Sequence, residues 1–172
     1  QDSWSVRIPE GVREVIGRRL DRLSERCNET LTVASVMGRE FTLAKLSPLI
    51  EDISVDRLLE VLDEALSARV IEELPRSVGY YQFTHALIQE TLSGELSTTR
   101  KVRLHARIAQ ALEELYGDDA DTHAAELADH FAEAQTMLGA EKMVRYSLLA
   151  GERALRSYGY EDALRNFRRA LA

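Results

Sequence analysis

Residues 70–83, VIEELPRSVGYYQF, form the one stretch of this sequence in which apolar and polar residues alternate instead of following a helical period. β-Branched and aromatic residues lie on both sides of a segment, residues 75–79, that contains proline and glycine, a pattern typical of two strands joined by a short loop. The stretch therefore predicts a β-hairpin with strands at residues 70–74 and 80–83. An isolated hairpin is only marginally stable in water, so we expect the preceding helices to pack against it.

Apolar residues recur at helical spacing in nine other stretches. The predicted helices cover residues 9–26, 28–37, 43–49, 55–68, 85–96, 100–116, 121–135, 140–157 and 160–172. Pro48 should break the third helix because it lacks a backbone N–H. The predicted N-caps are short polar side chains, namely Asn28, Thr42, Ser54, Thr84, and Thr98 or Thr99. The predicted inward faces include Val12, Val15, Ile16, Leu20 and Leu23 on the first helix, and Ala124, Ala125, Leu127, Ala128 and Phe131 on the seventh.

Composition limits the classes of function that fit this chain. Its 172 residues are 45% hydrophobic, which is enough for a buried core, and the net charge of -7 with a pI near 5.2 argues against a general nucleic-acid surface. Residues 113–141 hold nine acidic residues and no Lys or Arg, so we expect this side to repel polyanions. A single cysteine, Cys27, permits no intrachain disulfide and fits a reducing cytoplasm, and neither a signal peptide nor a membrane span is visible.

The last two predicted helices carry spacing similar to a tetratricopeptide repeat. Gly151 is followed by Ala163, Phe167 and Ala170 at offsets of twelve, sixteen and nineteen residues, and Tyr160 also fits. In that repeat the small residues mark close helix approach, and the aromatic ring fills the space between the helices. These five residues are therefore predicted to have packing roles. Ser147, Ala150 and the shifted turn glycine, Gly159, depart from the pattern.

Four segments together resemble a larger family. They are IPEGV at 8–12, ASVMGREF at 34–41, FTHALIQE at 83–90 and RLHARIAQAL at 103–112. Their order is similar to the region that follows the nucleotide-binding domain in bacterial STAND-class signalling ATPases, which include multidomain transcriptional regulators and cyclase- or kinase-linked regulators. The expected fold is mainly α: a winged-helix-like helical bundle with one β-hairpin, followed by antiparallel helix pairs that start a TPR-like array. The expected domains are a linker from an upstream domain at 1–8, the winged-helix-like domain at 9–98 and the TPR-like region at 99–172.

The resemblance also implies partners and a cofactor for the parent protein. An upstream nucleotide-binding domain would hold ADP or ATP, and this segment would hold no cofactor because it lacks a Gly-x-x-x-x-Gly-Lys-Ser/Thr loop. Further helical repeats would follow downstream and bind a protein partner or a small effector in the cytoplasm. We expect no contact with nucleic acid or membrane.

His85 is the candidate nucleotide-contact residue. In the resembled family, a histidine after the wing hairpin reaches back to the β-phosphate of ADP in the closed state. A helix N-terminus favours anions, and an imidazole beside it can donate to a phosphate oxygen. Ala86 replaces the acidic residue that usually follows, and a purely structural role beside the hairpin is the alternative.

The remaining histidines and polar residues suggest no chemistry. His105 is expected to be structural, and His123 and His130 are seven residues apart, too far for two ligands one helical turn apart, so no metal site is predicted. No nucleophile elbow or clustered acid and base is present, which predicts that the segment is not an enzyme.

Two functions fit this pattern. The first is a non-catalytic module that couples the nucleotide state of the upstream domain to a helical-repeat sensor. The alternative is a DNA-binding winged helix, because five arginines lie on the first helix (Arg13, Arg18, Arg19, Arg22 and Arg26). Glu14, Asp21 and Glu25 interrupt these arginines, and the 55–68 helix is acidic, which favours intrahelical ion pairs over a phosphate track.

Overall fold

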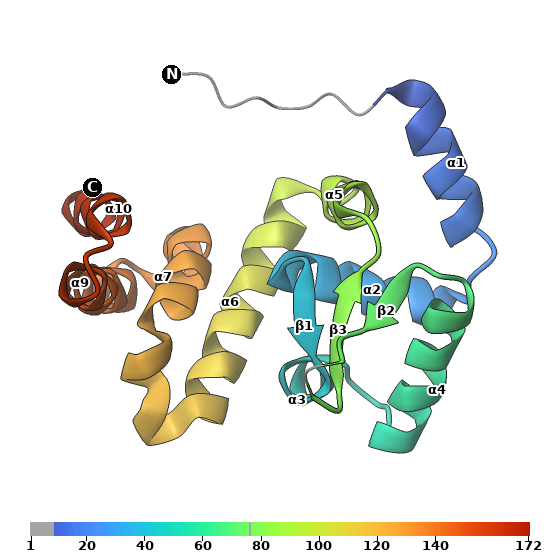
Figure 1. Ribbon diagram of the computed structural model, residues 1–172, viewed down its shortest axis with the longest axis horizontal. Helices are drawn as coiled ribbons and strands as arrows, with labels where there is room; N and C mark the ends of the chain where they lie inside the picture. Colours follow the sequence, from blue (N-terminus) through green and yellow to red (C-terminus); the bar gives the residue numbers. More distant parts are fainter. Residues whose placement is uncertain (1–8, 76) are drawn as a thin grey trace. The chain divides into compact units, whose positions relative to one another are not determined.

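The computed structural model of the chain describes residues 9–75 and 77–172 (Figure 1). This part is mainly helical, with a small three-stranded antiparallel sheet and antiparallel helix pairs, which confirms the predicted fold class. The residues divide into two compact units, one that ends at Leu96 and one that covers Ser97–Ala172. Each unit is described by itself.

The first unit surrounds the sheet with helices. Its elements are α1 (Glu10–Leu20), α2 (Glu25–Met37), β1 (Glu40–Thr42), α3 (Leu43–Leu46), the 3₁₀ turn η1 (Ser47–Leu49), α4 (Val55–Ser67), β2 (Ile71–Glu73), β3 (Tyr80–Phe83) and α5 (Ala86–Gly94). Pro48 lies in the 3₁₀ turn that ends α3, as its missing N–H predicts.

The predicted hairpin is present and forms two strands of the sheet. β2 and β3 pair antiparallel, with Ile71 opposite Phe83. A third strand, β1, was not predicted; it pairs with the other edge of β3 and places Phe41 opposite Tyr81. A strand of three residues is too short to show a period of its own. The ring of Phe41 lies 5.7 Å from that of Tyr81 and 5.6 Å from that of Phe83, so this edge strand supplies an aromatic cluster to the core.

Helices α1, α2, α4 and α5 share one hydrophobic core with this sheet. Among the residues that the structure describes, eighteen buried side chains form the core, and the ones with almost no exposure include Leu31, Leu46, Leu58, Leu62, Ile71, Phe83 and Ile88. Burial of one Leu, Ile or Phe side chain stabilises a fold by roughly 1.5–3 kcal/mol. The core therefore supplies the support that the short hairpin requires.

The junction between α1 and α2 differs from the prediction. The first helix ends at Leu20, and Ser24 rather than Asn28 caps the second, with its hydroxyl accepting a hydrogen bond from the Cys27 N–H. Asn28 instead lies inside α2 and donates its side-chain amide to the Leu20 carbonyl at 2.9 Å, which satisfies the end of α1. Val12 and Val15, predicted to face inward, are exposed.

The predicted caps Thr42 and Ser54 are confirmed, whereas the predicted cap Thr84 is wrong, as Asn28 is. Thr42 and Ser54 accept from backbone N–H groups at the starts of α3 and α4. Thr84 does not cap α5, because its hydroxyl donates to the Arg69 carbonyl at 2.9 Å and to that of Val70 at 3.2 Å. His85 occupies the N-cap position instead, without a side-chain cap.

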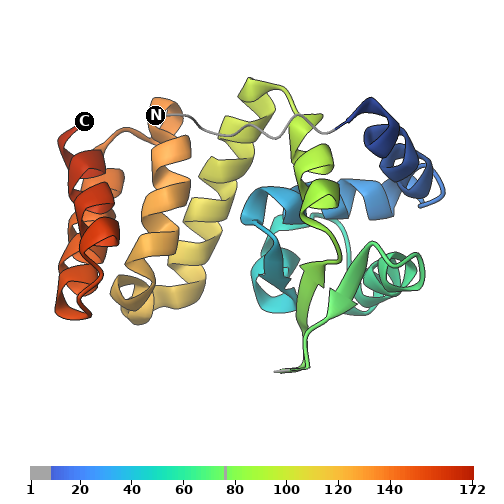
Figure 2. The same cartoon turned by 45° about the horizontal axis from the view of Figure 1, so that its top comes forward.

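The second unit is a row of helices in which each packs against the next (Figure 2). Its elements are α6 (Thr98–Tyr116), the 3₁₀ segment η2 (Gly117–His123), α7 (Ala124–Glu133), α8 (Gln135–Leu138), α9 (Glu141–Arg156) and α10 (Tyr160–Leu171). The cap of α6 is Ser97, one residue before the predicted threonines. Ala124, Leu127, Ala128 and Phe131 are buried as predicted, whereas Ala125 is exposed.

A partly buried polar contact joins α6 to α9. The Tyr146 hydroxyl donates to Glu113 Oε1 at 2.7 Å, and Lys142 pairs with the same carboxylate. Burial acts to raise the pKa of Glu113, but the hydrogen bonds from Lys142 and Tyr146 and the nearby cations outweigh burial and lower it. Burial and the bond to Glu113 raise the pKa of Tyr146 to about 12. Both groups therefore keep the protonation states that this contact needs at neutral pH.

The acidic stretch at 113–141 is partly neutralised. Arg145 pairs with Asp121 at 3.0 Å, and Arg169 pairs with Asp129 at 2.6 Å, in addition to the pair of Lys142 with Glu113. These cations come from α9 and α10. The prediction that this side repels polyanions was based on residues 113–141 alone. In the folded unit, cations of α9 and α10 offset part of the negative charge of these residues.

Candidate functional site

His85 lies at the junction of β3 and α5, with its side chain exposed. Its carbonyl accepts from the Ile88 N–H at 3.1 Å, and its imidazole makes no hydrogen bond or ion pair with any other residue that the structure describes. The strand before it is fixed, since the Phe83 N–H donates to the Arg39 carbonyl at 3.0 Å and the Thr84 N–H donates to the Val70 carbonyl at 3.1 Å. A rigid backbone thus presents an accessible imidazole at the N-terminus of a helix.

The predicted repeat-packing residues behave differently from one another. Gly151 faces Phe167 so closely that an added Cβ would lie 2.6 Å from the ring, and Ala163 is buried. Ala170 is half-buried on the same helix as Phe167. Tyr160 is exposed and does not pack between α9 and α10, so its packing role in a repeat array stays a prediction. The close approach of α9 and α10 therefore depends on Gly151, Ala163 and Phe167.

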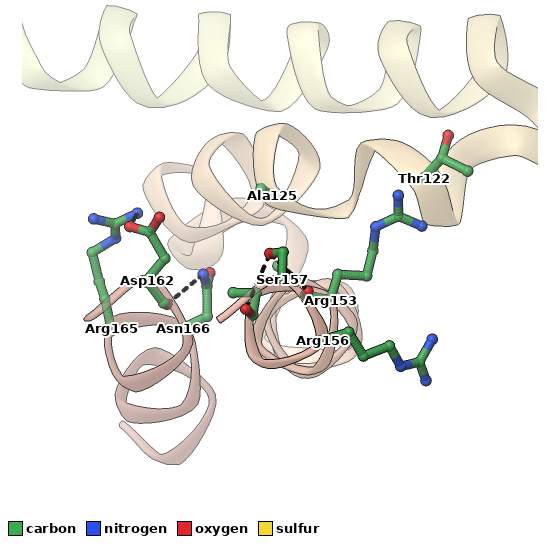
Figure 3. A pocket seen from close by; sticks show the side chains of 10 residues that line it. Thr122, Ala125, Arg153, Arg156, Ser157, Asp162, Arg165 and Asn166 are labelled. Carbon is green, nitrogen blue, oxygen red and sulfur yellow. Dashed lines mark hydrogen bonds and ion pairs between the residues drawn. The ribbon is translucent and has the colours of Figure 1, made fainter. Parts of the chain in front are cut away.

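A groove opens between η2, the start of α7, the end of α9 and the start of α10. Its volume is about 580 Å³, and Figure 3 shows the side chains that line it. Ala125, Ala150 and Ala154 leave the floor free of bulky groups. The polar residues that line the groove are Thr122, Arg153, Arg156, Ser157, Asp162, Arg165 and Asn166.

The three arginines of the groove differ in their pairing. Arg165 pairs with Asp162 at 2.7 Å, and Arg156 lies 3.8 Å from Glu152. Arg153 has no ion-pair partner within residues 9–75 and 77–172, and its side chain extends toward Thr122 (Figure 3). The sequence analysis did not single out these arginines. The only signal was the i, i+3 spacing of Arg153 and Arg156 beside small residues of α9, which many solvent-exposed helix faces share, and Arg165 on α10 had none.

His105 and His130 meet across α6 and α7, a contact that the sequence did not predict. Their Nδ1 atoms are 2.9 Å apart, and His130 is only 5% exposed. One ring must donate and the other accept, so the accepting ring is neutral. Burial lowers the pKa of His105, the charge of Lys101 adds to this, and that of Glu133 opposes it. His123 lies elsewhere, stacked on Tyr116 with ring centroids 3.8 Å apart.

Other reactive groups show structural roles. Cys27 is fully buried, its thiol donates to the Val61 carbonyl at 3.5 Å, and burial followed by the charge of Glu64 raises its pKa to about 12. The thiolate that nucleophilic chemistry needs is therefore disfavoured. No group of three or more metal-binding side chains comes together in the described residues.

Residues 9–75 and 77–172 include no helix whose length and apolar character would let it cross a lipid bilayer.

The contact of Gly151 with Phe167 gives a stability prediction. Gly151→Ala should lower the free energy of unfolding by about 1–3 kcal/mol, because the new methyl group must displace the ring. Gly17→Ala is the matched control: this helical glycine has open space around its Cβ position, so the change should stabilise by roughly 0.5–1 kcal/mol. Urea unfolding followed by circular dichroism measures both. Equal effects at the two positions would contradict the close packing of α9 and α10.

The histidine pair gives a pH prediction. Because the pKa of His105 is lowered on folding from its ordinary value of 6.5, its stabilising contribution is complete above that value and declines as the pH falls below it. His105→Gln should therefore make the urea midpoint of unfolding less sensitive to pH between about 7 and 5. His85→Gln, an exchange at an exposed imidazole outside the pair, is the control and should keep the parent pH dependence. If both variants keep the pH dependence of the parent protein, acidification does not destabilise the fold through the paired histidines.

Comparisons with models of protein families, with curated proteins and with solved structures find no match to this chain. Its function is therefore argued from its own residues and their arrangement.

Proposed function

We propose that this chain is a non-catalytic regulatory segment of a STAND-class signalling ATPase, which couples the nucleotide state of an upstream domain to a helical-repeat sensor. The observation that carries the proposal is the position of His85. This exposed imidazole lies two residues after the end of a strand that pairs on both edges, and it stands at the start of a helix, where an anion is favoured.

The coupling in this proposal is mechanical. In the closed state, His85 donates to a phosphate oxygen of ADP held by the upstream domain. The hydrogen bonds of Phe83 and Thr84 fix the backbone before His85 to the sheet, so that the contact would hold the whole first unit rather than one flexible loop. Exchange of ADP for ATP, or binding of a partner to the repeats, would then shift the population to an open state.

The second unit supplies the sensor in this proposal. Close approach of α9 and α10 at Gly151 and Phe167 supports a tetratricopeptide-like pair, and exposed apolar residues remain on both helices, including Leu148, Leu155, Leu164 and Leu171. Stacking of a further helix pair would cover such residues. Downstream repeats, a protein partner or a small effector in the cytoplasm are the proposed contacts of this unit.

A DNA-binding winged helix is the second candidate, favoured by the packing of helices beside the β2–β3 hairpin. The arginines of α1 and α2 argue against it: Arg18 pairs with Glu14 at 2.5 Å, and Arg26 pairs with Glu29 at 3.4 Å. On the acidic helix α4, Arg57 is paired with Glu60. These cations are already partly neutralised by carboxylates of their own helices.

Substitution of His85 tests the proposal in the full-length protein. His85→Ala should lower the ADP occupancy of the purified protein and raise its signalling output, because a donor to the phosphate is lost; a hydrogen bond to a charged group contributes roughly 1.5–3 kcal/mol. His123→Ala, an exchange at a histidine that stacks on Tyr116, is the control and should leave occupancy unchanged. Wild-type occupancy and output in His85→Ala would exclude this residue from the mechanism.

A DNA-binding assay separates the two candidates. The regulatory proposal predicts no binding of the chain to random duplex DNA at ~0.1 M salt, since the chain carries a net charge of -7 and Arg18, Arg26 and Arg57 are paired with carboxylates. Fluorescence anisotropy with labelled duplex measures this at several salt concentrations. Binding that weakens steeply with salt would favour the winged-helix candidate instead.

A further inference from the structure

We propose that the groove between η2, α7, α9 and α10 binds a small polyanion, a molecule with two or more carboxylate or phosphate groups on a short skeleton. The inference rests on the proposed sensor role of the second unit and names the chemistry of its effector. Figure 3 shows the groove and its arginines.

The side chains that line the groove carry an excess of positive charge. The residues that line the groove include three arginines and one aspartate, although the chain as a whole carries a net charge of -7. Asp162 is the one acid among them, and Arg165 neutralises it at 2.7 Å. The protein as a whole repels anions, but a local excess of cations favours the binding of an anion at this groove.

The groove also offers guanidinium groups whose hydrogen-bond donors are available to a ligand. Arg153 forms no ion pair inside the described ranges, and Arg156 approaches Glu152 only at 3.8 Å, with its side chain 78% exposed. A guanidinium group can donate two parallel hydrogen bonds to one carboxylate or phosphate. The hydroxyls of Thr122 and Ser157 already donate to backbone carbonyls, so the arginines supply the binding donors.

The directions of the helices that border the groove also bear on the charge of its ligand. Ala125 is the second residue of α7, and Asp162 is the third residue of α10, so the N-terminal turns of two helices border the groove. Backbone N–H groups at such ends carry a partial positive charge. The C-terminal turn of α9 also borders the groove and carries the opposite partial charge, which Arg153 and Arg156 in that turn offset. The two helix N-termini and the unpaired Arg153 therefore favour an anion.

The size and floor of the groove limit the ligand to a small molecule. Its volume of about 580 Å³ lies within the range of small-molecule sites, about 300–1,000 Å³. Ala125, Ala150 and Ala154 are the apolar residues that line it, which suits a ligand with a few carbon atoms beside its charged groups. An extended acidic peptide would need contacts beyond this groove.

Titration of the whole chain with two probes tests the inference. Citrate and inorganic pyrophosphate are added separately at ~0.1 M salt, to keep charge screening fixed, and binding is followed by amide NMR shifts. We expect saturable binding of at least one probe, with shifts at the groove residues. The probe that binds more tightly distinguishes a carboxylate ligand from a phosphate ligand. Hexaglutamate is a third titrant, which tests for an acidic peptide.

Two variants assign the binding to Arg153. Arg153→Gln should weaken the preferred probe roughly tenfold or more, the effect of one lost charge-assisted hydrogen bond. Arg168→Gln on α10 is the matched control, because Arg168 is exposed and does not line the groove. Thermal unfolding of both variants checks that the fold is intact.

Three outcomes would overturn the inference: no saturable binding of citrate or pyrophosphate, equal affinity in folded Arg153→Gln, or binding of hexaglutamate alone. These outcomes are independent of the His85 experiment. If His85→Ala changes nucleotide occupancy and the groove binds no polyanion, the ligand class is wrong and the coupling proposal stands. If the groove binds but His85→Ala has no effect, the coupling proposal fails alone.

Discussion

Pairing of β3 on both of its edges is the constraint on which the first unit depends. Four residues, Tyr80–Phe83, join β1 from one part of the chain to β2 from another, and the side chains of Tyr81 and Phe83 enter the core between the helices. Without both neighbours, so short a strand would leave its backbone groups unpaired, a cost of about 1–3 kcal/mol for each buried group. The same pairing fixes where α5 begins and therefore where His85 stands. Packing, strand register and the candidate site are thus consequences of one arrangement.

Much of this fold could be predicted because its patterns are local. The alternation at 70–83 specified the hairpin, and the helical spacing at 55–68 specified α4 with its Ser54 cap. Strand β1 could not be predicted, because its partner lies about forty residues away and three residues carry no period. The caps at Ser24 and Ser97 were misplaced for another reason: several short polar residues stand near each helix start, and only the backbone decides which one caps.

The candidate sites show the same division between local and distant information. Gly151 and Phe167 were predicted because a repeat pattern encodes their spacing, and the missing Cβ makes their contact possible. The pair of His105 and His130 was missed because the two residues belong to different helices, and no pattern within one helix predicts which side chains meet across two. The groove was missed because it needs side chains from η2, α7, α9 and α10 together. A sequence also cannot show which arginine lacks a partner.

The cations of the last two helices have two separate roles in the second unit. Lys142, Arg145 and Arg169 pair with carboxylates of the acidic stretch on α6, η2 and α7, so these pairs tie α9 to α6 and η2, and α10 to α7. The pair of Arg145 with Asp121 has two exposed partners and contributes only about 0–1 kcal/mol, so its main effect is to remove repulsion that would otherwise oppose packing. Arg153 takes no part in this neutralisation. Its charge is therefore left for the groove that it lines, which is how an acidic protein would favour an anion locally under the proposed ligand class.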